Sequence, residues 1–106
     1  MPEAMEVTTF KLINTSFDGF IAANAGIDRW LQMQPGFRSR RLARRADGTV
    51  VDILLWETAE HGEDAAARIM TETAAAAAHA LIDYRTVDWD VSQVSHRITA
   101  EGLAAA

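Results

Sequence analysis

The chain has 106 residues, about half of them hydrophobic, and fifteen acidic against ten basic residues give it a net charge of −5. That length suits one domain with a modest core, and a net acidic surface is a poor partner for nucleic-acid phosphates. No apolar run is long enough to span a membrane, no secretory signal precedes the first predicted strand, and without cysteine there are no disulfides, so we expect a cytoplasmic protein.

The first third of the chain predicts a strand followed by a helix. Residues 5–13 are rich in β-branched and aromatic side chains, which favours a strand. Residues 14–16, Asn-Thr-Ser, are candidate helix caps. Apolar residues then recur at helical spacing from Phe17 to about Gln34, and Pro35-Gly36 should end that helix.

A hairpin is predicted next. Strands over residues 37–45 and 49–57 flank Ala46-Asp47-Gly48, and three loop residues with glycine last indicate a type I turn whose final residue has a positive φ. The alanine-rich stretch from Ala59 to about Asp83 predicts a second helical region with a break near residues 71–73.

The end of the chain predicts a fourth strand and a tail. We interpret the alanine run at 74–78 as a closely packed helix face. Residues 87–97 alternate apolar and polar side chains, as a half-buried strand does. Residues 98–106 form a C-terminal tail, and its last part, from residue 100, should be frayed or lie along a neighbour.

The resulting order, β-α-β-β-α-β, predicts one ferredoxin-like α+β domain over residues 1–106, with its core at about 5–97. Two helices should cover one face of a four-stranded antiparallel sheet. The third strand is apolar on both sides, with Val50, Leu54 and Trp56 on one and Val51, Ile53 and Leu55 on the other. A strand of this kind is normally buried on both faces, so we expect a homodimer that packs sheet against sheet.

Five arginines crowd residues 38–45, but they alternate between the two sides of the strand and lack interleaved aromatics, unlike a nucleic-acid platform. Arg44 and Arg45 should be solvated near the turn, and those nearer the middle should pair with Asp52, Glu57 or a partner subunit. Alternatively, Arg40 or Arg41 lies at a pocket mouth and binds an anionic group.

Several short motifs along this order resemble the dimeric α+β barrel superfamily, and within it the antibiotic-biosynthesis-monooxygenase-like proteins. The resemblance covers roughly residues 5–97 and is carried by Glu6-Val-Thr-Thr-Phe-Lys11, Trp30-Leu31, Gln34-Pro35-Gly36-Phe37, Asp47-Gly48 and Leu55-Trp56-Glu57.

This resemblance implies a homodimeric α+β barrel with a pocket between sheet and helices in each subunit. The superfamily includes cofactor-free oxygenases of polycyclic phenols, haem-degrading enzymes, isomerases and proteins of no established activity. Haem-degrading members carry an asparagine in the first strand and a tryptophan–histidine pair on the second helix. Here Thr8 and Thr9 replace the asparagine and His79 stands without a tryptophan, so no haem or other cofactor is expected.

Seven residues are candidates for a ligand site. Asn24 and Asp28 lie four apart on the first helix, and Asn24 interrupts its apolar stripe, so it either makes a structural bond or positions a ligand. Three scattered histidines do not suggest a metal site, but His79 is a candidate base or else a structural group at a helix end. The remaining candidates are Trp30 and Trp56 as aromatic walls, Tyr84 as a proton donor or interface anchor, and Arg40 as an anion binder.

Two functions follow from these candidates. The first is a small-molecule enzyme, a cofactor-independent monooxygenase that deprotonates a phenolic aromatic substrate and holds the anion near dioxygen. The second is a non-catalytic ligand-binding or structural dimer of the same fold. A sealed core near Asn24 and His79 would exclude the enzyme.

Overall fold

A computed structural model of the chain describes residues 2–103. Its elements follow the predicted order with additional breaks. They are β1 (Ala4–Leu12), α1 (Phe17–Ala23), α2 (Ala25–Gln32), β2 (Phe37–Arg44), β3 (Val50–Trp56), α3 (Ala59–Glu72), the 3₁₀ helix η1 (Ala77–Leu81), β4 (Ile82–Gln93), β5 (Ile98–Thr99) and β6 (Gly102–Leu103). Among these residues, no helix is both long and apolar enough to cross a membrane.

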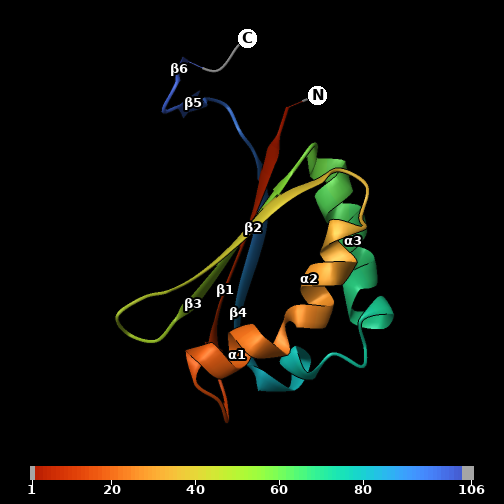
Figure 1. Cartoon of the computed structure of the whole chain (residues 1–106), viewed down its shortest axis with the longest axis vertical. Coiled ribbons are helices and arrows are strands. Elements are labelled where there is room, and N and C mark those ends of the chain that lie inside the picture. Colours follow the sequence, from red (N-terminus) through yellow and green to blue (C-terminus); the bar gives the residue numbers. More distant parts are fainter. Residues whose placement is uncertain (1, 104–106) are drawn as a thin grey trace.

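Four antiparallel strands form the main sheet in the order β2-β3-β1-β4. Figure 1 shows α1, α2 and α3 together on one side of this sheet, so the described part of the chain places no helix over the other side. The predicted ferredoxin-like α+β arrangement is therefore confirmed. Beyond β4, β5 and β6 pair into a small hairpin that projects from the sheet near the N-terminus (Figure 1).

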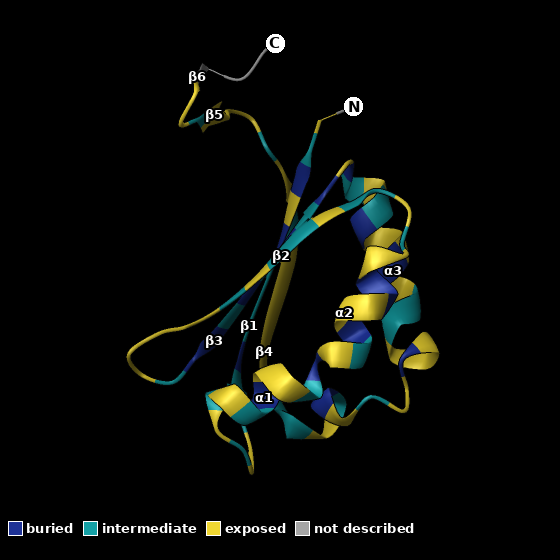
Figure 2. Ribbon diagram, in the orientation of Figure 1, coloured by how far each residue is buried: buried dark blue, intermediate teal, exposed yellow. Residues whose placement is uncertain are grey.

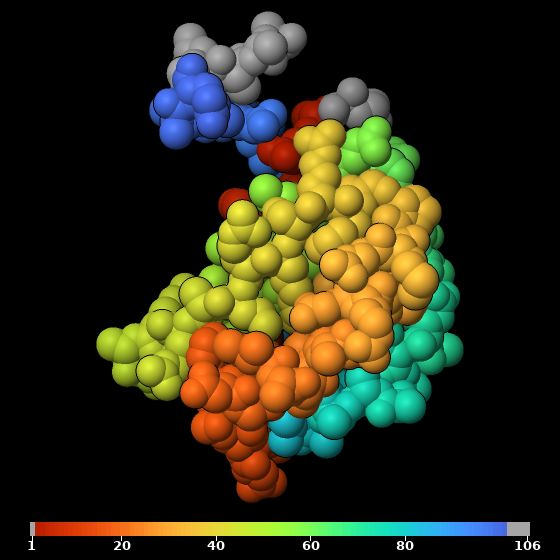
Figure 3. Space-filling view, viewed as in Figure 1, coloured from red at the N-terminus to blue at the C-terminus, as the bar shows by residue number. Residues whose placement is uncertain are grey.

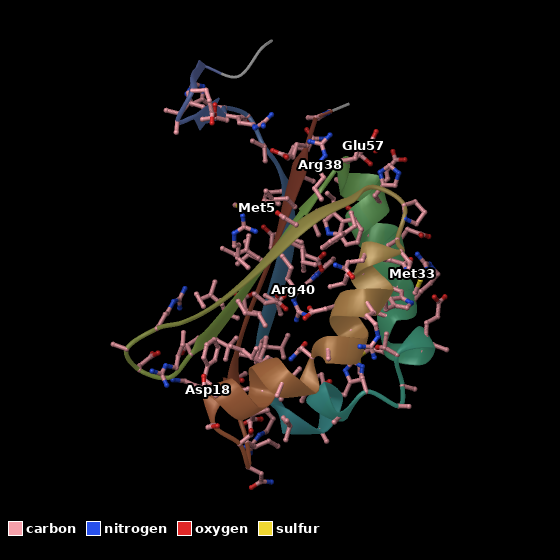
Figure 4. All side chains as sticks on the ribbon, in the orientation of Figure 1. Met5, Asp18, Met33, Arg38, Arg40 and Glu57 are labelled. Atoms are coloured by element: carbon pink, nitrogen blue, oxygen red, sulfur yellow. The ribbon has the colours of Figure 1, made fainter. Side chains whose placement is uncertain are left out.

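The sheet has two different faces. On β3 every second residue is buried, from Val50 to Trp56, and these residues face the helices. Figure 2 shows the same asymmetry on the helices, whose buried positions gather on the side towards the sheet. On the opposite face Val51, Ile53 and Leu55 are only partly buried, and Met5 beside them points away from the helices (Figure 4).

The first predicted helix is two helices, because the chain breaks at Asn24. Asn24 has φ −90° and ψ 0°, and its backbone N–H donates to Ile21 O. In a regular α-helix it would donate to Phe20 O instead. Its side chain Nδ2 donates to Phe20 O, and its own carbonyl accepts the N–H of Asp28, which starts α2. An asparagine that bonds locally to backbone competes with continuous helix.

The second predicted helical region breaks after Glu72, as expected near residues 71–73, but the alanine run that follows is not one closely packed helix face. Regular helix ends at Glu72, and the Thr73 hydroxyl donates to Ile69 O, the acceptor that the backbone N–H of Thr73 also uses. Ala74 and Ala75 are exposed, and Ala76 is extended with ψ 130°. Alanine favours helix locally, but its methyl group buries little surface, so it does not hold an unpacked turn in place.

The fourth strand begins five residues earlier than predicted. β4 runs from Ile82 to Gln93, so Asp83 belongs to the sheet and not to the helix end, and Tyr84 after it lies in the sheet as well. Residues 94–97 lie outside the strand. The alternation from Val87 onward is confirmed, because Trp89 and Val91 share the inner face with Thr8 and Glu6. Of the tail, residues 104–106 lie outside the described residues.

Two glycines allow the predicted turns. Gly48 closes the β2–β3 hairpin with φ +88°, and the Asp47 carboxylate accepts the backbone N–H of Thr49 at 2.9 Å. Gly36 ends the first helical layer with φ +78°, and its carbonyl accepts the N–H of Glu57 at 2.7 Å. Both conformations are strained for residues with a Cβ.

We expect Gly36→Ala to destabilise the protein by at least about 1 kcal/mol more than Gly48→Ala, by urea unfolding. Both substitutions place a Cβ at positive φ, but only the one at Gly36 would overlap the imidazole ring of His61, whereas Gly48 faces open space. Equal losses in the two variants would show that His61 moves aside freely.

Candidate functional site

A cavity of about 560 Å³ lies between the inner face of the sheet and the helical layer. Most of its wall is hydrophobic, contributed by Phe10, Phe20, Ile27, Leu31, Leu54 and Ile69. Its volume lies within the range of about 300–1,000 Å³ usual for small-molecule pockets. Figure 3 shows the helical layer, with α1 and α2 in orange, lying against β2 in yellow on this side of the molecule.

The cavity brings together residues that are far apart in the sequence. Its lining includes six of the seven candidates, namely Asn24, Trp30, Arg40, Trp56, His79 and Tyr84. Asp28 is not part of the lining. It lies on the exposed side of α2 and reaches the site only through a bond to Arg40. The core beneath the helices is therefore not sealed near Asn24 and His79.

Glu6 on β1 is a buried carboxylate in the cavity wall, only 7% exposed. Trp56 on β3 donates its indole N–H to Oε1 at 2.8 Å, and Trp89 on β4 donates to Oε2 at 2.6 Å. Burial raises the pKa of this carboxyl, and nearby Asp52 adds to the rise. The two indole bonds and the charge of Arg40 oppose it without cancelling it.

Arg40 forms the second polar cluster. Its Nε and Nη2 donate to the two oxygens of Asp52 at 3.1 and 2.9 Å, and its Nη1 donates to Asp28 at 2.8 Å. Figure 4 shows Arg40 between β2 and α2. The expected ion pair with Asp52 is present. Since two carboxylates already neutralise this guanidinium, it is a poor anion site. Arg41, the alternative anion binder, pairs with Ile53 and lies on the other face of the sheet, away from the cavity.

Register explains why Arg40 and not Arg38 enters the cavity. A β-bulge between Phe37 and Ser39 interrupts the alternation, so Phe37 and Arg40 both face inwards. Arg38 instead pairs with Glu3 at 3.1 Å near the sheet end. Simple alternation along this strand did not predict the bulge.

A chain of hydrogen bonds defines the tautomer of His79. The single hydroxyl hydrogen of Thr73 is donated to Ile69 O, so Thr73 Oγ1 must accept from His79 Nε2–H, at 2.8 Å. Nδ1 therefore carries the free lone pair of the neutral ring. It faces the hydroxyl of Tyr84 at the long distance of 3.4 Å, and burial raises the pKa of that phenol, which favours its protonated form.

Asn24 has an unmet acceptor. Its amide is oriented by the bond from Nδ2 to Phe20 O at 2.7 Å, because a carbonyl accepts only from the NH₂ end. Asn24 is 1% exposed, and its Oδ1 is the one buried side-chain polar atom without a partner among the described residues. A buried acceptor without a donor costs about 1–3 kcal/mol.

Sequence reasoning missed Glu6 and Trp89 as site residues. Strand alternation contained a usable signal for Glu6, because Phe10 is a core residue and positions two and four before it should face the same way. The partner of Glu6 on β4 depends on strand pairing across 83 positions and has no local signal. Within residues 2–103 no cluster of three or more metal-ligating side chains is present.

No protein-family model matches the sequence, and no curated protein matches it. Solved structures do match. A variant of SnoaB, a cofactor-independent oxygenase from Streptomyces nogalater, is 22% identical, with a TM-score of 0.71 over 92% of this chain and 97% of that chain. A putative antibiotic biosynthesis monooxygenase from Chloroflexus aurantiacus is 13% identical, with a TM-score of 0.66 over 92% and 97% of the two chains.

A third match is a monooxygenase from the gene ActVA-Orf6 of Streptomyces coelicolor, solved in complex with nanaomycin D. It is 17% identical, with a TM-score of 0.62 over 92% of each chain. At these identities the likeness is one of fold. The chain therefore has the fold of antibiotic-biosynthesis-monooxygenase-like proteins, as its motifs predicted.

We expect Glu6→Gln to change how stability depends on pH. The folded state holds the Glu6 proton more tightly than the unfolded chain, because its pKa is raised above the ordinary 4.5. Stability from this carboxyl is therefore present below pH 4.5 and is lost as the pH rises through the folded pKa. Relative to the variant, the wild type should lose free energy of unfolding from acid to neutral pH, as measured by urea titrations.

Glu60→Gln, on the exposed start of α3, controls for the loss of one negative charge. The difference in free energy of unfolding between the wild type and Glu6→Gln should change with pH. If this difference is constant, or if it increasingly favours the wild type as the pH rises, the pKa of Glu6 is not raised.

Proposed function

We propose that this chain, which has the fold of antibiotic-biosynthesis-monooxygenase-like proteins, is a cofactor-independent monooxygenase of a phenolic aromatic substrate. The observation that carries the proposal is the cavity, about 560 Å³ of mostly hydrophobic space with a few buried polar groups in its wall. Flat aromatic rings fit hydrophobic walls, and a small number of polar groups can then orient them.

The reaction requires only the electrons of the substrate. A base removes a proton from an acidic carbon of the phenolic ring system, and the resulting carbanion adds to dioxygen to form a peroxide anion. Protonation of that anion by the conjugate acid gives a hydroperoxide, which loses water and leaves a carbonyl. In total one CH₂ group and O₂ become C=O and H₂O, so one oxygen atom is incorporated and the other is reduced.

His79 is the proposed base. Its Nδ1 has a lone pair because Nε2–H is donated to Thr73, and its one contact there, Tyr84 Oη, is 3.4 Å away and easily exchanged for a ligand. The position on η1 places the imidazole in the cavity lining. Tyr84, also in the lining, is the proposed proton donor or ligand anchor beside it.

Aromatic and polar walls complete the proposed site. Trp30 and Trp56 are positioned as walls for a ring system, and each indole is held by a carboxylate, Glu72 for Trp30 and Glu6 for Trp56. Asn24 is proposed to contact a substrate oxygen. Asp28 and Arg40 act together, with Asp28 holding the guanidinium from outside.

We expect dioxygen uptake with a hydroxyanthrone-type phenol in the absence of added metal or flavin, followed with an oxygen electrode. His79→Gln should lower the rate about a hundredfold, since a positioned base contributes that order of acceleration. His96→Gln is the matched control, because His96 is exposed in the segment after β4 and does not line the cavity.

Unchanged uptake in His79→Gln would remove His79 as the base. If the phenol raises the melting temperature of the wild type but no oxygen is consumed, the protein is the non-catalytic ligand-binding alternative. Glu6 keeps a structural role in either case, since both of its oxygens already accept indole N–H groups.

The open face of the sheet supports a proposed homodimer. Val51, Ile53 and Leu55 on β3 stand beside Met5 and Val7 on β1, and no helix of residues 2–103 lies over them. A second copy of the same face would cover them, in line with the resemblance that predicted a dimeric barrel. A cytoplasmic location and the absence of nucleic-acid binding stay predictions from composition.

We expect the wild type to behave in light scattering as a particle of twice 11.6 kDa. Ile53→Asp, at the centre of the open face opposite Val7 and Arg41, should reduce it to 11.6 kDa while circular dichroism stays unchanged. A buried unpaired charge is costly at such an interface. Gln32→Asp, on the exposed side of α2, adds the same charge elsewhere as a control. A wild type of 11.6 kDa would refute the dimer.

A further inference from the structure

We infer that Thr73 is a positioning residue for His79. It decides which ring nitrogen can take up a proton, although its own side chain does not face the cavity. The inference rests on the proposed function in one respect, namely that the lone pair on His79 Nδ1 is the one that acts on the ligand. It follows from the hydrogen bonds at the junction between α3 and η1.

Thr73 lies behind the imidazole ring and outside the cavity. His79 and Tyr84 are part of the cavity lining, but Thr73 is not. Thr73 lines a separate groove instead, together with the exposed residues Met33 and Ala75. A substitution at Thr73 therefore changes the back of the imidazole and leaves the surface that a ligand contacts as it is.

The single hydrogen of the Thr73 hydroxyl has one possible place. Thr73 Oγ1 lies 2.5 Å from Ile69 O. Two oxygens come this close only with a hydrogen between them, and the carbonyl has none to give, so Thr73 donates. The same Oγ1 lies 2.8 Å from His79 Nε2, and there it can act only as an acceptor. Nε2 therefore carries the ring proton.

The backbone of Thr73 keeps this acceptor in place. Its N–H donates to the same Ile69 carbonyl at 2.9 Å, and its own carbonyl accepts the N–H of Ala76, also at 2.9 Å. Every polar atom of Thr73 is thus bonded. The end of α3, and not the imidazole, sets where the accepting lone pair of Oγ1 points.

Thr73 orients the ring but cannot carry a proton away from it. A hydroxyl passes a proton on only if its own acceptor can take one. Ile69 O is an amide carbonyl, which accepts hydrogen bonds but is not protonated at neutral pH. The Nε2 proton therefore stays on the ring, and proton uptake and release occur at Nδ1, which faces Tyr84.

A second threonine–histidine pair on the same helix lacks this constraint. Thr58 caps the start of α3, where its Oγ1 accepts the backbone N–H of His61 at 3.3 Å and lies 2.7 Å from His61 Nδ1. Within residues 2–103 this hydroxyl is bonded to no carbonyl, so its hydrogen is free and the pair can form in either tautomer. His61 does not line the cavity.

The test reads the tautomer of His79 by NMR. Carbon and nitrogen shifts of the imidazole distinguish the two neutral forms at about pH 9, where imidazoles are uncharged. The wild type should be mainly in the Nε2–H form. In Thr73→Val that proton has no acceptor, whereas a proton on Nδ1 still meets Tyr84 Oη. The ratio should therefore move at least about fivefold towards Nδ1–H.

Thr73→Ser keeps the hydroxyl and should return the tautomer ratio to that of the wild type. Thr73→Val should still fold, because the backbone N–H of Thr73 continues to serve Ile69 O. With a hydroxyanthrone-type phenol, Thr73→Val should lower kcat about fivefold and leave KM within about twofold of the wild type, since the side chain does not line the cavity.

Thr58→Val is the matched control. It makes the same substitution at a buried, histidine-bonded threonine at the other end of α3, and it removes a helix cap. This variant should be less stable than the wild type, but the tautomer ratio of His79 and kcat should not change. A purely structural effect of losing a threonine from α3 is thereby separated from an effect on the ring.

The outcomes separate the two proposals. A wild-type His79 mainly in the Nδ1–H form would overturn the positioning role, whatever the variants do. An unchanged ratio in Thr73→Val, or a ratio that Thr73→Ser does not restore, would overturn it too. A ratio that moves while kcat stays constant would also overturn it, because the lone pair would then not matter to turnover. The expected shift and rescue without any oxygen uptake by the wild type would support the positioning of the ring and refute the monooxygenase.

Discussion

The Glu6 carboxylate connects three adjacent strands, because Glu6 is on the central β1 and its two oxygens accept from Trp56 on β3 and Trp89 on β4. Ionised carboxylates are rarely buried without partners, and indole N–H groups are donors without charge. The arrangement therefore gives a buried carboxyl group two hydrogen-bond partners inside the sheet face while fixing both tryptophans. Much of the cavity wall depends on it, since a ring that swings out of place would open or fill the space above β1.

The second polar cluster is an ion pair that accommodates a buried carboxylate near the edge of the sheet. Asp52 lies on the buried side of β3, where the alternation would call for an apolar residue, and Arg40 from β2 pairs with it through two bonds. Removing one partner of such a pair would leave a buried charge, which is strongly destabilising, whereas the intact pair contributes little net stability. Both residues line the cavity, so the pair shapes this part of its wall.

Local patterns predicted most of the fold but not all of its interruptions. The hairpin at Gly48 and the stop at Gly36 were readable because positive φ strongly favours glycine. The weak helix at residues 71–73 was also readable, and α3 ends there at Glu72. The helix break at Asn24 was not, because it depends on a side-chain bond to backbone that competes with helix. Among site residues, Glu6 was within reach of the alternation argument, whereas Trp89 was not.

The sequence by itself determined the order of strands and helices, the inner and outer faces of β3 and the two glycine turns, because these follow from periodicities of two and 3.6 residues and from local backbone sterics. Only the tertiary structure decided which polar atoms meet in the cavity. Strand pairing brings Glu6 within 2.6 Å of an indole 83 residues away, and a β-bulge turns Arg40 inwards. Such contacts depend on register between distant segments, which no local pattern encodes.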